Sequence, residues 1–331
     1  MVKLSILDLA PIVEGGDAGG AFRAALKLAQ HGEALGFSRY WMAEHHSMPG
    51  IASAATAVAL AFVGAGTSTI RIGAGGVMLP NHAPLVIAEQ FGTLESLFPG
   101  RIDLGLGRAP GSDQAAAYAL RRNLASDEAQ FPRDVIELMS YFKGDGGRVR
   151  AVPGEGLAIP LWILGSSLFG AQLAAALGLP FAFASHFAPG QMIEAIHIYR
   201  ATFKPSGQLD EPYVMLGYNA FAADSDAEAR LLASSLSQAF VNLRTGRPGK
   251  LPPPVKDYPD TLPLSARLML DAVLECSAVG TVASVGAAIA AFVARTGADE
   301  LMITSQIFDP DARLKSYALV MSALEAVGQV R

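Results

Sequence analysis

The sequence contains one cysteine, few charged residues and no surplus of positive charge. Cys276 alone cannot form a disulfide within the chain, and it excludes a cysteine zinc knuckle or a dithiol redox pair. We therefore expect a reducing compartment and a cytoplasmic protein. The 25 basic residues against 30 acidic ones leave a net charge of −5, so we expect neither nucleic acid nor a membrane surface as a partner.

Long hydrophobic runs are also absent, although 51% of the residues are hydrophobic. The longest apolar stretch, residues 51–66, is rich in alanine and too short to span a bilayer comfortably. We interpret this stretch as a packed helix. Since only 17% of the residues are charged, the composition predicts a chain with a large interior.

Short apolar runs alternate with helical patterns along the chain, which indicates an α/β protein with a parallel sheet. Eight strands that are each followed by a helix favour a closed (β/α)8 TIM barrel over an open doubly wound sheet. We expect one domain over residues 1–331, with excursions at about 113–160 and 245–263, after strands 4 and 7. The second excursion, rich in proline and glycine, suits a lid. The expected strands are residues 4–9, 39–43, 70–79, 101–107, 161–164, 181–184, 214–222 and 300–304.

Residue types common in functional sites follow five of the first six expected strands. In a barrel of this kind the active site lies at the carboxyl ends of the strands, so these side chains should converge on one rim. For any one of them, an ordinary polar loop is an equally good explanation. The residues are Glu44-His45-His46, Gly75-Gly76, Arg108, Ser166-Ser167 and Ser185-His186.

Arg108, Ser166 and Ser167 predict a phosphate site. The serines stand at the start of an expected helix, where free backbone N–H groups and the helix dipole favour an anion. An arginine can add two charge-assisted hydrogen bonds. The alternative is a serine N-cap beside a surface arginine. Residues 105–111 look like a dinucleotide fingerprint, but the third glycine comes one residue late and Pro110 interrupts the turn, so a mononucleotide phosphate fits better.

Two adjacent pairs, one of histidines and one of glycines, need separate explanations. Because neighbouring residues on a strand point to opposite sides, His45 and His46 are poor partners for one ion, and we expect no metal. One imidazole should face the pocket as a hydrogen-bonding group or general base, and the other should face away. Gly75-Gly76 is unusual for a buried strand and predicts a planar ring packed on the backbone, with barrel curvature as the alternative.

Several separated segments, in order along nearly the whole chain, resemble the bacterial-luciferase-like flavin monooxygenases, most closely the single-chain bacterial members. The resemblance implies a (β/α)8 barrel that binds FMN. It also implies that the reduced flavin comes from a separate NAD(P)H:flavin reductase and that oxygen is activated on the flavin. The matching segments are residues 43–46, 73–80, 89–90, 99–101, 105–108, 178–180 and 297–302.

Carried over by position, the resemblance implies a role for each matching residue. His45 corresponds to the catalytic histidine, and Gly75-Gly76 to a cis peptide beneath the flavin ring. Arg108 and Ser167 correspond to phosphate ligands, with Ser166 where luciferase has glutamate. The remaining cofactor-binding positions are Glu44, and Phe183, Ala184 and Ser185 along the ring.

The resemblance also implies a homodimer built from the helices expected at 51–66 and 84–98. In luciferase, the positions of His46 and Glu89 hydrogen-bond across the subunit interface. Two positions depart from the luciferase pattern. Gly107 stands where luciferase has a reactive cysteine, which argues against light emission, and His82 is displaced by one residue, so its role is not carried over.

The leading functional hypothesis is therefore an FMN-dependent monooxygenase that oxygenates a small, partly apolar substrate. A deazaflavin-dependent oxidoreductase of the same superfamily and a non-catalytic flavin-binding protein are the alternatives, and a metal-dependent barrel hydrolase is a distant third. The candidate substrate-lining residues are Trp41, Leu79, Phe183 and Phe187.

Overall fold

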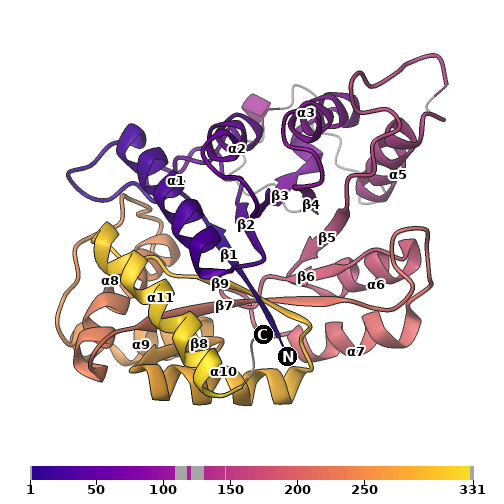
Figure 1. Ribbon diagram of the computed structural model, residues 1–331. Helices are drawn as coiled ribbons and strands as arrows, with labels where there is room; N and C mark the ends of the chain where they lie inside the picture. Colours follow the sequence, from indigo (N-terminus) through magenta and orange to yellow (C-terminus); the bar gives the residue numbers. More distant parts are fainter. Residues whose placement is uncertain (1, 109–117, 121–129, 146, 329–331) are drawn as a thin grey trace.

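The computed structural model describes residues 2–108, 118–120, 130–145 and 147–328, and its centre is a closed parallel barrel (Figure 1). Eight strands pair in the order β1-β2-β3-β4-β5-β6-β7-β9, and β9 pairs with β1 to complete the ring. The predicted (β/α)8 fold is confirmed. The barrel strands are β1 (Lys3–Asp8), β2 (Arg39–Met42), β3 (Arg71–Met78), β4 (Ile102–Gly107), β5 (Leu161–Gly165), β6 (Phe181–Phe183), β7 (Val214–Ala222) and β9 (Glu300–Thr304).

A ninth strand, β8 (Ser277–Gly280), was not predicted. It pairs in parallel with the last four residues of β7, beyond the part of β7 that pairs with β6, and β9 reaches only the first of these four, Asn219. Its four residues, Ser-Ala-Val-Gly, form no apolar run, so the sequence carries no strand signal there. Pairing with the overhanging end of β7 is what makes this segment a strand.

Helices surround the barrel, and their ends follow local capping rules. Asp17 caps α1 by accepting a hydrogen bond from the backbone N–H of Gly20, and Gly36, at φ 83°, ends that helix in the left-handed region. None of the helices in the described ranges is long and apolar enough to cross a membrane. The helices are α1 (Ala18–Leu35), α2 (Thr56–Ala65), α3 (Pro84–Leu97), α5 (Gln130–Lys143), α6 (Leu168–Leu177), α7 (Met192–Thr202), α8 (Asp226–Arg244), α9 (Leu264–Val273), α10 (Val282–Thr296) and α11 (Pro310–Ala326), with 3-10 turns η1 (Leu79–Asn81) and η2 (Tyr258–Thr261).

The helix expected at 51–66 begins only at Thr56, so the prediction was wrong for its first five residues. Ile51 forms an isolated bridge with Pro11, and the backbone N–H of Ala52 donates to the carbonyl of Ala10. These bonds tie the segment to the loop after β1 and take backbone groups that a helix would need.

The two expected excursions have different outcomes. The start of the first lies mainly in residues 109–117 and 121–129, outside the described ranges, and α5 forms its middle. The second is anchored at Leu251, whose backbone N–H donates to Ile12 and whose carbonyl accepts from Glu14. Since Leu251 is also buried, the centre of the expected lid is fixed to the loop after β1.

Successive side chains along each strand point to opposite faces of the sheet, and this divides the apolar side chains into two layers. Ile6, Tyr40 and Ile72 belong to the layer between the strands and the helices. A second cluster fills the barrel interior, and it contains residues one position away from the first set. Its members are Leu7, Trp41, Ala43, Trp162, Ala182, Met215 and Met302.

Buried charges close the amino-terminal end of the barrel. The Arg39 guanidinium donates to Asp103 and to Glu300, at 2.8 Å in each case. Arg71 donates to the other oxygen of Asp103 at 2.7 Å, and the Tyr213 hydroxyl donates to Glu300 at 2.8 Å. Both carboxylates are fully buried, and burial with the neighbouring Glu300 raises the pKa of Tyr213 well above its ordinary value. Each charge has a partner, as a buried charge requires.

Arg39→Ala should lower the free energy of unfolding by about 3–5 kcal/mol, because it leaves Asp103 and Glu300 with less compensation inside the barrel. Arg150→Ala removes an arginine from the exposed pair with Glu155 and should change stability very little. Urea unfolding of the two variants measures the difference. Equal stabilities would show that the buried network does not support the barrel.

Candidate functional site

The segment after β2 sends its side chains to two different places. The barrel interior contains the side chains of Arg39, Trp41 and Ala43. If the alternation continues past the strand, His45 lies on the interior side, and Glu44 and His46 point toward the helices. The contacts agree, since His45 interacts electrostatically with His186 after β6, whereas His46 and Glu44 bond to each other. These contacts are in line with two imidazoles on opposite sides, and the pocket-facing role of His45 stays a prediction.

His186 shares the interior side with His45 and had been given no role from the sequence. Gly217 on β7 makes room for it, because a Cβ there would lie 2.2 Å from His186 Nδ1. The Asn219 side-chain amide donates to the His186 carbonyl, and the Ser185 hydroxyl donates to the Gly217 carbonyl, both at 2.7 Å. Only the polar pair Ser185-His186 after an apolar strand signalled this site.

The His186 imidazole is held in its neutral form. Burial, and secondarily the charge of His45, lowers the pKa of His186 to about 4. Its Nδ1 is shielded from solvent and has no hydrogen-bond partner among the described residues. The site therefore contains a neutral imidazole whose Nδ1, packed against Gly217, makes no hydrogen bond to a described residue.

The peptide bond between Gly75 and Gly76 is cis, as the resemblance implied. Glycine is required here by close contacts, since a Cβ on Gly76 would lie 2.7 Å from the Gly105 carbonyl oxygen. A Cβ on Gly75 would lie 2.9 Å from Leu7 and 3.1 Å from Trp41. The pairing register with β4 also shifts in this stretch. These contacts explain the glycines without a ligand, so the packed flavin ring stays a prediction.

The predicted phosphate residues come together at the start of α6. The Arg108 guanidinium lies 4.3 Å from the centre of the Phe169 ring, in the first turn of that helix. Ser167 is the extended N-cap residue, and its hydroxyl makes no capping hydrogen bond. Ser166 is exposed beside it. The Arg108 guanidinium and the serine hydroxyls thus lie beside the free backbone N–H groups at the start of α6, an arrangement suited to binding a phosphate. Residues 109–111 of the same glycine-rich segment lie outside the described ranges.

Most of the expected substrate-lining side chains lie elsewhere. Leu79 and Phe183 are buried in the layer beneath the helices, and the Phe183 ring packs 6.0 Å from Phe181. Trp41 is in the interior but packs against Trp162, at 5.1 Å between ring centres. Phe187 is exposed, 5.3 Å from the His186 ring. The lining role was therefore wrong for both side chains: strand alternation turns Phe183 away from the interior, and Leu79 begins η1 and packs in the same layer beneath the helices.

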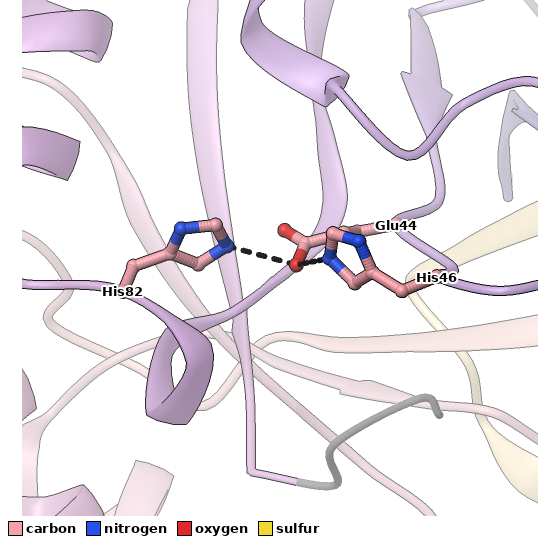
Figure 2. Close-up of side chains that lie close together, drawn as sticks. All are labelled: Glu44, His46 and His82. Carbon is pink, nitrogen blue, oxygen red and sulfur yellow. Dashed lines mark hydrogen bonds and ion pairs between the residues drawn. The ribbon is translucent and has the colours of Figure 1, made fainter. Parts of the chain in front are cut away.

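Glu44 forms a second polar cluster, outside the barrel wall (Figure 2). Its Oε1 accepts hydrogen bonds from Nε2 of His46 at 2.7 Å and of His82 at 2.8 Å, and its Oε2 accepts one from the Met78 backbone at 3.2 Å. Burial alone would raise the pKa of Glu44, but the bonds from His82 and His46 outweigh it and lower that pKa. The carboxylate that we expected at the cofactor thus faces away from the interior.

His82 joins this cluster without any signal in the sequence. It lies 36 residues from His46 along the chain, and the resemblance gave it no role. Within its own chain, His46 bonds to Glu44 rather than to Glu89. A pocket of about 370 Å³ opens beside the cluster and is lined by residues of α2, α3 and the cluster itself.

A model of the luciferase-like monooxygenase family matches residues 2–300. The chain belongs to this family. It is 53% identical over 326 residues to a protein named luciferase-like monooxygenase from Escherichia coli K12, and the match covers 98% of this chain and 97% of that protein. N-acetyl-S-alkylcysteine monooxygenase from Bacillus subtilis is 36% identical over 256 residues, or 75% of each chain. The structure of apo-MsnO8 is 33% identical, with a TM-score of 0.87 over 98% of this chain and 99% of that one.

Two more distant solved structures share the family's barrel. The oxygenating constituent of 3,6-diketocamphane monooxygenase from Pseudomonas putida, a type II Baeyer–Villiger enzyme in complex with FMN, has a TM-score of 0.73 at 18% identity, over 97% of this chain and 96% of that one. An F420-dependent secondary alcohol dehydrogenase with an F420–acetone adduct has a TM-score of 0.69 at 14% identity, over 98% and 99%. Membership of this monooxygenase family supports oxidoreductase activity.

His186 should make the fold sensitive to acid. Because its pKa is lower in the folded protein than its ordinary 6.5, its contribution to stability is complete above about pH 6.5 and is lost as the pH falls toward 4. In His186→Gln, the free energy of unfolding should fall by up to about 3 kcal/mol less than in the wild type over the same pH range. His197→Gln, at an exposed position on α7, should leave this pH-dependent loss unchanged. Urea unfolding from pH 7 to 4 tests this, and parallel curves for wild type and His186→Gln would contradict it.

Proposed function

We propose that this chain is an FMN-dependent monooxygenase of the two-component kind. It would take reduced FMN from a separate NAD(P)H:flavin reductase and insert one atom of O2 into a small, partly apolar substrate, the other atom leaving as water. The reaction would take place in the cytoplasm. One observation carries the proposal: two groups of residues lie on loops at the carboxyl end of the same barrel. Arg108 and Ser167 are the proposed phosphate ligands, and His45 and His186 are the second group.

The described residues fit an FMN phosphate. Arg108 and Ser166 are exposed, and the N-cap hydroxyl of Ser167 is not used by the helix. The guanidinium is positioned by its stacking on Phe169, so it would reach a phosphate at the α6 N-terminus without first being ordered. The cis Gly75–Gly76 bond and the backbone of Phe183, Ala184 and Ser185 are the proposed ring contacts. The outward turn of Glu44 leaves only its backbone for such a role.

Bound reduced FMN would supply two electrons and the reaction with oxygen. His45 would hydrogen-bond at the reacting oxygen atoms and move a proton there. His186, kept neutral, would orient His45 or the substrate without adding a second positive charge. Apolar side chains in the barrel interior, among them Trp41 and Met215, would exclude water from the reacting atoms.

The substrate would enter beside Phe187, the one expected lining side chain that is exposed. A panel of thioethers, aldehydes, ketones and aromatic compounds, assayed with reduced FMN and labelled O2, tests the proposed chemistry. A mass gain of one oxygen atom in a product would support it. The thioethers are included because of the N-acetyl-S-alkylcysteine monooxygenase relative.

A deazaflavin-dependent oxidoreductase is the second candidate, because an F420 enzyme has the same barrel. Titration of the protein with FMN and with F420 separates the two, since the preferred cofactor should quench protein fluorescence at a lower concentration. A non-catalytic flavin-binding protein would bind FMN but release only peroxide with every substrate in the panel.

Arg108→Ala and His45→Ala should separate cofactor binding from turnover. Loss of Arg108 should raise the Kd for FMN about ten- to hundredfold and leave that for riboflavin, which has no phosphate, unchanged. Loss of His45 should leave FMN binding intact and lower the rate of oxygenation at least ~100-fold. Fluorescence titration and product analysis measure the two effects. Full activity of His45→Ala would overturn its catalytic role.

We also propose a homodimer through α2 and α3. These helices expose four large apolar side chains, Val58, Phe62, Val86 and Leu97, on a face that monomeric proteins rarely leave open to water. The pocket that contains His46 opens on the same side of the barrel, as expected for an interface near this residue.

Val58→Asp should convert the dimer into a monomer, because Val58 is 73% exposed on α2 and a charge would be buried by the partner. Leu264→Asp makes the same change at a similarly exposed position on α9 and should leave the dimer intact. Light scattering after size-exclusion chromatography gives the masses. A wild-type monomer would contradict the proposal.

A further inference from the structure

We propose that Glu44, His46 and His82 form a binding site for one divalent transition-metal ion, outside the barrel wall and separate from the proposed flavin site. One carboxylate oxygen and two imidazole nitrogens lie within 4.8 Å of one another. Two histidines and one carboxylate are a donor set that first-row transition metals prefer over calcium or magnesium. In Figure 2 the carboxylate lies between the two rings, and both rings direct Nε2 at it.

Two of the three distances between donor atoms are close to those of a metal site. The two nitrogen atoms are 2.7 and 2.8 Å from Glu44 Oε1 in the hydrogen-bonded arrangement. In a tetrahedral zinc site with bonds of about 2.0–2.1 Å, donor atoms lie about 3.3 Å apart. The contacts would therefore open by about half an ångström. The two ring protons now on Nε2 would move to Nδ1 or to solvent as the ion takes their place.

Further contacts hold two of the three ligands, Glu44 and His82, in place. The second oxygen of Glu44 accepts the Met78 N–H, which fixes the carboxylate plane. His82 is held at the end of η1, where its backbone N–H donates to Leu79 at 2.9 Å. Such outer contacts orient metal ligands and reduce the cost of assembling the site.

Charge and access also favour a cation. Glu44 is only 2% exposed, and its buried carboxylate faces two rings that are neutral when they act as ligands. In the single chain the imidazoles are 16% and 25% exposed and line the pocket of about 370 Å³, so an ion can reach them before two chains associate. The small side chains of Ala54, Ala55 and Ala57 leave space there for water or another exchangeable fourth ligand.

A bound ion would fix the positions of Glu44 and His46, the two sequence neighbours of His45. Glu44 and His46 would be ligands, while His45 projects to the opposite side of the same segment, toward His186. All three ligands come from one chain, so the site needs no ligand from the proposed partner and does not depend on the proposed flavin chemistry.

The experiment uses the full-length, tag-free protein after removal of metal with a chelator. Isothermal titration with ZnCl2 at pH 7.5 should show one Zn²⁺ per chain, and bound Co²⁺ should show the visible absorption of a low-symmetry site with nitrogen ligands. An excess of Mg²⁺ should displace neither ion. Absence of binding at millimolar Zn²⁺ would overturn the proposal.

Three variants locate the bound ion. His82→Gln and Glu44→Gln should each weaken Zn²⁺ binding at least about tenfold, because each removes one of three ligands. Glu44→Gln keeps a hydrogen-bond acceptor for the two imidazoles, and thermal unfolding confirms that both variants fold. His197→Gln removes an exposed imidazole on α7 and should leave binding unchanged. Unaltered affinity in folded His82→Gln and Glu44→Gln would place the ion elsewhere and overturn the assignment.

Discussion

In a closed parallel barrel, successive side chains along a strand point alternately into the barrel interior and into the layer beneath the helices. This alternation governs both ends of the molecule. At the amino-terminal end it turns Arg39, Asp103 and Glu300 inward, where they neutralise one another. Beyond the carboxyl end of β2 it turns His45 inward and Glu44 and His46 outward. Three consecutive residues thereby serve two separate polar sites.

The two ends of the barrel differ in how far their polar groups are satisfied by partners within the chain. The Arg39 network satisfies its charges completely, so that end is closed and rigid. At the other end, two polar groups have bonding capacity that no described residue uses: Nδ1 of His186 makes no hydrogen bond there, and the N-cap hydroxyl of Ser167 makes no capping bond. Such groups cost stability unless a ligand satisfies them, which is why they favour a binding site at this end.

Close packing requires glycine at three positions on two strands, β3 and β7. At Gly76 any side chain would meet the backbone of β4, and at Gly75 it would meet Leu7 and Trp41. At Gly217 it would meet the His186 ring. The positions of His186 and of the cis bond thus depend on missing side chains on neighbouring strands, and larger residues there would have to displace them.

The sequence by itself determined the barrel, the eight strands that close it, the cis Gly75–Gly76 bond and the group of Arg108 with the serines. These follow from local periodicity and from residues adjacent in the chain, or from a resemblance that spans it. It did not determine β8, the start of α2, or the outward position of Phe183, because these depend on which backbone groups and layers lie next to them. Only the tertiary structure brought His82 to Glu44 and His186 toward His45, since residues far apart in sequence meet only when the sheet closes and its alternation assigns each side chain to one face.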